Sequence, residues 1–511
     1  MEASTRGGAR SAGIIEALYI ETVPSFDPLS RLLGGLAAIL GLAATWVYVS
    51  AGLSLSHYDA KAHLVVARRI LDSLTPSWEQ IGAVWLPLPH VLNALPVQID
   101  FFYRTGASAI AMSVVSFAIT AACLSAIVMK LTGSRAGATL AAALFALNPD
   151  VLYLQSTPMT EPLLFGLTAL VVLHLTEWAL QDAVEIRRAA GWTIVLAALT
   201  RYEAWPVIAA AMVASAFAKW RRGTALPLVV GQMLRLAVYP AGAVVFFVLM
   251  SRITTSHWFV TGGFFVPDPE LQGRPTAVWD ALVKGTEDLG GTRLVAGAMI
   301  LAMSLVVIAL VKRAESALLM SLALLAAGAL PCYAYFSGHP FRIRYEVPLV
   351  VGCALVVGTG VGLLQRLAPF AAAAMLAAVL LQVQPFDRDA PMLREAQLDR
   401  ANGIGRRQVT ACLRQGYDGT SIMASMGALA HYMQELSLEG FNIADFIHEG
   451  SGPLWDFALS KGPASLAGWV LVEEVAEGGD VLYQRQKAAP FFLDGFDRIC
   501  EGGNVALYRR R

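Results

Sequence analysis

Charge is scarce in this sequence. Asp, Glu, Lys and Arg together make up 15% of its 511 residues, while 56% of the residues are hydrophobic. Soluble proteins carry about 25% charged residues, so the shortage indicates that lipid surrounds most of the chain. The formal net charge is zero, which excludes a broad basic face for binding nucleic acid.

Several chemical motifs are also absent. The sequence has no phosphate-binding loop, no metalloprotease helix and no cysteine spacing of the zinc type. Three of its five cysteines, Cys123, Cys332 and Cys353, lie in apolar runs, where free thiols act as small core residues. Cys412 and Cys500 lie in the polar C-terminal part. An oxidising compartment would allow them to form a disulfide, but the sequence leaves their pairing open.

In place of charge, the sequence has a series of long hydrophobic runs. A transmembrane helix needs about 20 apolar residues, and about eleven runs approach that length. They cover residues 32–49, 107–129, 136–154, 163–180, 189–199, 204–217, 236–250, 294–311, 317–336, 347–364 and 368–383. The two runs beside Arg201 are short, which favours a hairpin in a thin or water-filled part of the bundle. We therefore predict a polytopic α-helical membrane protein.

Basic residues indicate how the chain is oriented. If residues 1–31 form a cytoplasmic segment, every short loop on that side contains Lys or Arg, as cytoplasmic loops usually do. The predicted membrane module then spans residues 32–384, with a long first outer loop at 54–106. An odd number of spans places residues 385–511 outside. The compact loops are typical of a bacterial inner membrane protein.

The last part of the chain, residues 385–511, is predicted to be a small α/β domain outside the membrane. Four runs have the composition of strands. They cover residues 421–425, 469–474, 481–484 and 505–508. Residues 428–435 have a helical pattern.

Charged residues near the outer membrane surface are the strongest functional signal. Charges at membrane depth are costly and are usually retained for a function. Four separate segments place charged residues at this surface, whereas charges placed at random would scatter over both faces. The residues are Asp59, Lys61, Glu161, Arg201, Glu203, Arg342 and Arg344.

Two of these acidic residues are candidates for catalysis. Asp59 follows the first span, where a carboxylate suits a general base acting on an acceptor hydroxyl. The alternative for Asp59 is a helix N-cap, ahead of an amphipathic helix predicted at residues 62–74. Glu161 is either a site residue or a carboxylate that favours the positive end of the next helix, which Thr160 is expected to cap.

Three of the basic residues indicate an anionic partner. Arg201, Arg342 and Arg344 lie at one level of the predicted topology, and arginine is a natural phosphate ligand. A lipid phosphate is the anion expected at that depth. A divalent metal is the alternative ligand of this loop region. Its candidate ligands are His57, Asp59 and His63, whose spacing is not diagnostic.

At these residues the sequence resembles the type C glycosyltransferase (GT-C) superfamily. It is most similar to the branch that contains the lipid A aminoarabinose transferase, the protein O-mannosyltransferases and related polyprenyl-phosphate-sugar transferases. The resemblance covers residues 32–383. The matching motifs are Tyr58-Asp59-Ala60, Ala67-Arg68-Arg69-Ile70, Pro87-Leu88-Pro89, Asn148-Pro149, Thr160-Glu161-Pro162, Thr200-Arg201-Tyr202-Glu203, and Arg344-Tyr345 followed by Pro348.

The resemblance implies roles for particular residues. Asp59 would be the catalytic base, and Arg344, with Arg342 nearby, would hold the lipid phosphate. The full set of candidates for binding substrate and lipid phosphate is Lys61, His90, Arg201, Glu203, Arg342, Arg344 and Tyr345.

The sequence departs from the family's pattern at two positions. Ala60 stands where a second acidic residue is usual, so the second carboxylate would be Glu161 or Glu203. Leu86 replaces the usual lysine of the proline-rich segment. This change transfers the phosphate contacts to the arginines or to Lys61.

The activity implied by the resemblance is inverting transfer of a monosaccharide. The sugar would move from a polyprenyl-phosphate carrier to a hydroxyl of a glycan, lipid or protein, with the C-terminal domain shaping the acceptor site. The main alternative is a flippase or transporter for lipid-linked sugars, which would favour internal repeats and charges near the bilayer midplane. A scaffold would leave the clustered charges unexplained, and an oligosaccharyltransferase would be expected to carry a peptide-binding motif.

Overall fold

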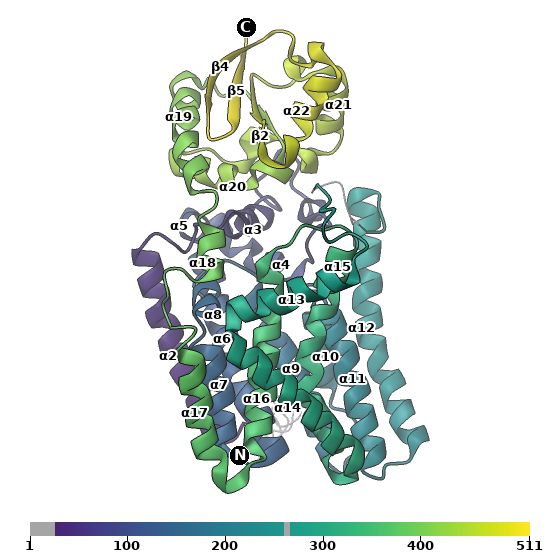
Figure 1. The fold of residues 1–511 in the computed structure, drawn as a ribbon. Helices are drawn as coiled ribbons and strands as arrows, with labels where there is room; N and C mark the ends of the chain where they lie inside the picture. Colours follow the sequence, from purple (N-terminus) through teal and green to yellow (C-terminus); the bar gives the residue numbers. More distant parts are fainter. Residues whose placement is uncertain (1–25, 260–265) are drawn as a thin grey trace, which may run out of the picture.

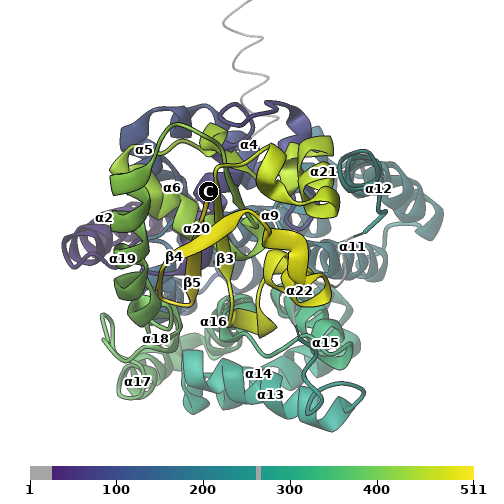
Figure 2. The ribbon, with the colours of Figure 1, turned by 90° about the horizontal axis from the view of Figure 1, so that it is seen from above.

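The computed structural model describes residues 26–259 and 266–511. Figure 1 shows a bundle of long helices with a mixed α/β domain stacked on one end, and Figure 2 shows that domain lying over the bundle. Most of the predicted cytoplasmic segment, namely residues 1–25, lies outside the described residues, as do residues 260–265.

Seven helical segments of the described chain are long and apolar enough to cross a membrane. They are α2 (Pro28–Ser50), α6 (Ala107–Thr132), α9 (Glu161–Leu180), α12 (Leu226–Thr255), α14 (Thr292–Val311), η3 with α15 (Arg313–Phe336), and η4 with α16 (Ile343–Gly362). Shorter apolar helices are α7 (Arg135–Ala146), α10 (Arg188–Ala198), and η5 with α17 (Gln365–Leu380). With α11 (Ala204–Arg221), every predicted hydrophobic run falls on one or more helices. The protein is an integral membrane protein, and the predicted fold class is confirmed.

The start of the first span shows how local sequence sets a helix end. The Asp27 carboxylate accepts hydrogen bonds from the backbone N–H groups of Leu29 (3.0 Å) and Ser30 (3.2 Å). Pro28 occupies the first turn, where its missing N–H removes no helical bond. The helix therefore begins before the apolar run that predicts it.

The run predicted at 136–154 is not one continuous helix. Helix α7 ends at Ala146, and a separate short helix, α8 (Pro149–Leu154), follows it. Asn148 caps α8 by accepting from the N–H groups of Asp150 and Val151, both at 3.1 Å. Pro149 cannot extend α7, because it has no N–H and its ring clashes with the preceding turn.

The first outer loop is folded into short helices between the bundle and the C-terminal domain (Figure 1). They are α3 (Tyr58–Arg68), η1 (Trp78–Ile81), α4 (Leu88–Ala94), η2 (Pro96–Gln98) and α5 (Asp100–Thr105). The helix predicted at 62–74 therefore begins earlier and ends earlier than expected. On the other side of the bundle end, α13 (Pro275–Gly290) packs against α14, α15 and α16.

The C-terminal domain is built on a five-stranded mixed sheet in the order β2-β1-β3-β5-β4. The strands are β1 (Ile422–Ala424), β2 (Phe446–Ile447), β3 (Trp469–Glu473), β4 (Phe496–Gly502) and β5 (Val505–Arg510). Strand β1 is parallel to β2 and β3, and β5 is antiparallel to β3 and β4. The surrounding helices are α18 (Pro391–Ala396), α19 (Arg400–Gly416), α20 (Met426–Leu436), α21 (Pro453–Lys461) and α22 (Val481–Ala488).

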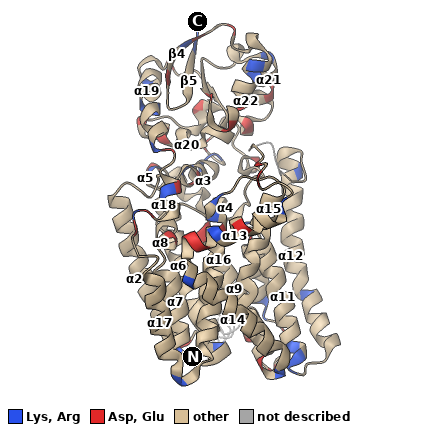
Figure 3. Ribbon diagram, in the orientation of Figure 1, with Lys and Arg blue, Asp and Glu red and all other residues tan. Residues whose placement is uncertain are grey.

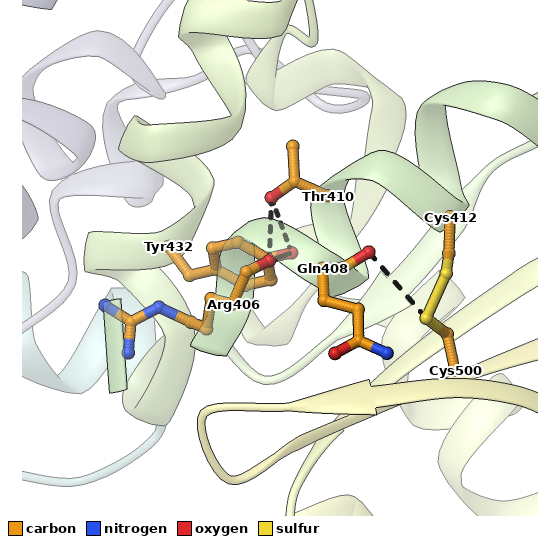
Figure 4. The surroundings of a disulfide bond; sticks show 6 residues. All are labelled: Arg406, Gln408, Thr410, Cys412, Tyr432 and Cys500. Carbon is orange, nitrogen blue, oxygen red and sulfur yellow. Dashed lines mark hydrogen bonds between the residues drawn. A yellow bond between two sulfur atoms is a disulfide. The ribbon is translucent and has the colours of Figure 1, made fainter. Parts of the chain in front are cut away.

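Three of the four predicted strands and the predicted helix are confirmed in this domain. The strand predicted at 481–484 is wrong, because these residues form the first turn of α22. Asp480 caps that helix by accepting from the Tyr483 N–H at 2.8 Å. Strands β2 and β4 were not predicted. A disulfide joins Cys412 of α19 to Cys500 of β4 (Figure 4), which resolves the pairing that the sequence left open.

Candidate functional site

Charged residues are concentrated at the two ends of the bundle. Figure 3 shows Lys, Arg, Asp and Glu between the helices and the C-terminal domain and again at the opposite end, with few in the middle of the bundle. Helices α3, α9 and η4, together with the turn before α11, contribute charged residues to the end that faces the domain. The segments that contain the predicted site residues meet at the end that faces the domain, where Asp59 pairs with Arg344, Arg201 with Glu161, and Lys61 with Glu435.

The centre of the site is an ion pair between Asp59 and Arg344. Asp59 lies in the first turn of α3 and Arg344 lies in η4, just before α16. The Arg344 Nη1 atom donates to Asp59 Oδ2. Both residues are buried, with Asp59 only 7% exposed and Arg344 9% exposed. The pair therefore unites two segments that are far apart in the sequence.

The surroundings of Asp59 favour its charged form. Burial opposes ionisation, but the Arg344 guanidinium lowers the pKa of Asp59 to about 2. The N-cap of α3 is His57, whose Nδ1 accepts from the Asp59 N–H at 3.1 Å. The alternative prediction, in which Asp59 is the cap, is therefore wrong. Its carboxylate is directed to Arg344 instead.

A second buried cluster is centred on Arg201. Its guanidinium lies 3.0 Å from Glu161 Oε1 and 2.6 Å from Glu203 Oε1. It also donates to the Thr160 hydroxyl at 3.0 Å. Thr160 occupies the N-cap position of α9 without making the expected cap bond. The predicted partners Arg201, Glu161 and Glu203 are thus brought together in one group.

The two clusters leave polar atoms without partners. Within the described chain, the buried Nε of Arg344 has no hydrogen-bond partner. Both Glu161 carboxylate oxygens likewise lack a hydrogen bond, although one lies within ion-pair distance of Arg201. Buried donors and charges without partners are costly, so they indicate groups that a ligand would satisfy.

A histidine pair lies near Asp59, since His63 follows it by one turn on the same face of α3. His63 Nδ1 is 3.1 Å from His90 Nε2, and His90 Nδ1 is 3.2 Å from the Leu86 carbonyl oxygen. Burial lowers the pKa of His90 to about 3, so this ring is neutral. Because a carbonyl only accepts, His90 donates from Nδ1 and accepts from His63, which leaves His63 Nε2 as an acceptor.

The candidate metal ligands are not arranged as a metal site. Among residues 26–259 and 266–511, no group of three or more His, Cys, Asp or Glu side chains is placed to hold a metal ion. His57 lies 3.5 Å from Glu395 and caps α3, while His63 contacts His90. The three predicted ligands therefore point to different partners.

Other predicted site residues lie around the rim. Arg342 pairs with Glu477 of the C-terminal domain at 3.1 Å and is partly exposed. The Tyr345 ring lies 5.3 Å from the Arg344 guanidinium carbon and packs against it. Lys61 pairs with Glu435 of α20 at 2.6 Å. Lys61 is thus in contact with the C-terminal domain, and its predicted contact with a lipid phosphate stays a prediction.

Two acidic residues near the site were missed by sequence reasoning. Glu395 of α18 approaches His57, and Glu346 accepts from the Tyr335 hydroxyl at 2.7 Å. Glu346 directly follows a predicted motif, so its position at the start of a span was a signal that could have found it. Glu395 lies in the C-terminal part, far from His57 in the sequence, and only the fold brings α18 next to the site.

Two small pockets adjoin these clusters. One is lined by His63, His90, Thr160, Asn93 and Ser113 with apolar neighbours, between the first outer loop and the ends of α6 and α9. The other is lined by Glu203, Thr168 and apolar residues of α9, α11, η3 and α16. The second pocket links the arginine cluster to the apolar interior of the bundle.

Comparison with known proteins identifies the fold. No protein-family profile matches the sequence, and no curated protein matches it. Among solved structures, the chain is similar to ArnT from Cupriavidus metallidurans bound to undecaprenyl phosphate, with a TM-score of 0.54 and 12% sequence identity. The match covers 92% of this chain and 97% of that one. The chain therefore has an ArnT-like fold, with bundle and outer domain both included.

Proposed function

We propose that this protein is a membrane glycosyltransferase that uses a polyprenyl-phosphate-linked sugar. The observation that carries the proposal is the buried pair of Asp59 and Arg344 beside the Arg201 cluster. A carboxylate suited to take a proton and guanidinium groups suited to bind a phosphate lie together at the end of the bundle that faces the C-terminal domain. The ArnT-like fold, found in a protein solved with undecaprenyl phosphate, supports the same conclusion.

Arg344 is the proposed ligand of the donor phosphate. Its free Nε donor and its planar guanidinium fit a phosphate oxygen pair. Arg201 would supply further positive charge, while Glu161 and Glu203 keep it oriented in the absence of donor. The small pocket beside Glu203 and Thr168 is otherwise apolar, and it would have to widen to receive the first part of the polyprenyl chain.

Asp59 is the proposed general base. Paired with Arg344 it is a weak base, because its pKa of about 2 lies far below neutral pH. A bound phosphate would share the Arg344 charge and so raise the proton affinity of Asp59. Donor binding would therefore prepare the base for its reaction.

The reaction is a single displacement with inversion. Asp59 takes the proton of the acceptor hydroxyl as that oxygen forms a bond to the anomeric carbon. The bond from the anomeric carbon to the phosphate oxygen breaks, and its electron pair leaves with the lipid phosphate. Arg344 and Arg201 stabilise the charge that develops on this leaving group. Glu161 is the second carboxylate that the site offers to the acceptor or the sugar.

We place the reaction at the outer face of a bacterial inner membrane. The basic loops support a cytoplasmic N-terminus, with residues 385–511 in the periplasm. The Cys412–Cys500 disulfide of that domain is consistent with an oxidising compartment. The acceptor would be a glycan, lipid or protein hydroxyl presented from that side.

The test is transfer of radiolabelled sugar by the purified protein from a panel of polyprenyl-phosphate sugars. We expect the wild type to release or transfer the sugar from at least one donor, and well-folded Asp59→Asn to lose the activity. Activity that survives this substitution would move the base to Glu161 or Glu203. No transfer or hydrolysis with any donor, together with lipid movement in vesicles, would support the flippase alternative and refute the proposal.

A further inference from the structure

Helix α3, which carries Asp59, packs directly against the C-terminal domain. Leu64 and Val65 of α3 share one hydrophobic core with Leu429 and Met433 of α20 and with residues of the sheet. These residues are fully or almost fully buried. Figures 1 and 2 show α20 on the face of the domain that covers the first outer loop. The domain and α3 therefore form one packing unit.

A chain of charged residues crosses the same interface. Lys61 Nζ lies 2.6 Å from Glu435 Oε1. Glu435 also accepts two hydrogen bonds from Arg406, at 3.0 Å and 2.9 Å. Arg406 in turn donates to both carboxylate oxygens of Asp399, at 3.0 Å and 2.6 Å. Glu435 thus bridges one cation on α3 and one in the domain.

Arg406 is the anchor of this chain. It is 1% exposed, and its charge is matched by the two carboxylates of Glu435 and Asp399. A buried arginine with bidentate partners is held in a defined geometry. Its helix, α19, is tied to β4 of the sheet by the Cys412–Cys500 disulfide (Figure 4). The anchor is therefore fixed to the body of the domain.

Lys61 and Asp59 are carried by the same short helix. A helix moves as a rigid rod, so a restraint on Lys61 also restrains the Asp59 carboxylate. Displacement of a reacting group by about 1 Å can cost about 10²-fold in rate. The link to Glu435 thus acts on the distance between Asp59 and the acceptor.

We infer that Glu435 and Arg406 are positioning residues that hold the base of α3 in place. The role of the C-terminal domain is then to support the catalytic helix from outside the membrane. This inference rests on the proposed function only for its effect on rate. The restraint on α3 itself is measurable without any sugar donor.

The first test is hydrogen exchange of the α3 amides in the full-length protein. In Glu435→Gln we expect these amides to exchange about tenfold faster than in the wild type. The matched control is Glu439→Gln, which removes an exposed ion pair with Arg414 near the same helix, and α3 should exchange as in the wild type. Unchanged exchange in Glu435→Gln would overturn the inference.

Lys61→Met breaks the link from the other end and leaves Arg406 with both carboxylates. Lys61→Met replaces Glu435→Gln in this test if the latter folds poorly. We expect the α3 amides to exchange faster in Lys61→Met by the same factor. Each variant should lower kcat by about tenfold while donor affinity stays within about twofold. The double variant should be no slower than either single one, since both break one link. Losses that multiply in the double variant, or a change confined to donor affinity, would contradict the positioning role.

Failure of the proposed function and failure of the inferred restraint on α3 give different results. If the wild type transfers no sugar but α3 exchange rises in both variants, the proposed function fails and the restraint stands. If the wild type is active and α3 exchange is unchanged, the restraint fails and the proposed function stands.

Discussion

At the scale of single residues, the proposed chemistry depends most on Arg344. It is buried, its Nη1 is paired with Asp59, and its Nε is left without a partner among the described residues. A buried guanidinium with one carboxylate and one free donor is suited to receive a second anion. We therefore propose that this one guanidinium serves two anions, Asp59 through Nη1 and the donor phosphate through Nε.

Loss of this guanidinium should be severe. We expect Arg344→Gln to lower kcat/KM for the donor by about 10²–10³, because the leaving phosphate loses its main charge partner. Arg344→Lys should recover only part of this loss, since an ammonium cannot form the bidentate contact. Steady-state transfer assays with varied donor will measure both. Arg366→Gln, in η5 between α16 and α17, is the control, and an equal loss there would contradict the assignment.

Some site residues were predictable from sequence and others were not. Asp59, Arg201, Glu203 and Arg344 each stand in a short motif beside an apolar run, so their depth in the membrane follows from hydropathy. The partner of Lys61 was not predictable, because Glu435 lies in another domain with no motif around it. Hydropathy predicts the level of a residue along the membrane normal, but it does not predict which neighbour that residue contacts.

At the scale of the elements, the apolar helices were the most predictable part. In lipid, backbone N–H and C=O groups must form hydrogen bonds within their own segment, so a long apolar run in a membrane forms a helix. The break between α7 and α8 was visible in the sequence, because Asn148 followed by Pro149 is a pair that favours the start of a new helix. The Val481–Gln484 segment has strand-like composition, but the Asp480 cap starts a helix there. Local capping outweighed the β propensity of a short run.

The disulfide between α19 and β4 closes a long loop. Cys412 and Cys500 are separated by 88 residues, so their link removes much of the freedom of the unfolded domain. We expect the Cys412→Ser/Cys500→Ser variant to lose about 2–4 kcal/mol of stability in this domain. Thermal unfolding of the full-length protein under oxidising and reducing conditions will measure the loss. Equal midpoints for variant and wild type in oxidising buffer would contradict it.

At the scale of the whole molecule, an apolar bundle supports a small domain that carries many buried polar groups. The bundle and the domain were each predictable, but their contact was not. The shared core of α3 and α20 joins residues from opposite ends of the sequence. Such long-range packing leaves no periodic pattern in either segment. The contact between the domain and α3, the helix that carries Asp59, is therefore visible only in the structure.

Buried histidines should make the outer domain sensitive to acid. Burial, with the nearby Arg406 charge, lowers the pKa of His431 to about 4, although Asp399 and Glu435 act in the other direction. The unfolded chain binds a proton near pH 6.5, so His431 stabilises the fold above that pH. This stability is lost as the pH falls toward 4, by at most about 1.4 kcal/mol per unit.

The variant His431→Gln isolates this effect. Asp480 opposes the trend, because burial raises its pKa to about 7 and its protonation favours the folded state on acidification. The prediction therefore concerns the difference between wild type and variant. Between pH 7 and 5, the apparent melting temperature of His431→Gln should fall less than that of the wild type. This range lies within the interval where His431 protonates in the unfolded chain but not in the folded one, from about pH 6.5 down to about 4. Parallel pH profiles would contradict it.

The central claim is that Asp59 is the base and that it shares Arg344 with the donor phosphate. The direct test is to measure donor binding and sugar transfer for wild type and Asp59→Asn in the same preparation. Transfer should fall by at least about 10²-fold, as expected for loss of a general base. Donor binding should stay equal or become tighter, because the competing carboxylate charge is gone. A variant that still transfers sugar, or one that loses donor binding along with transfer, would contradict the account.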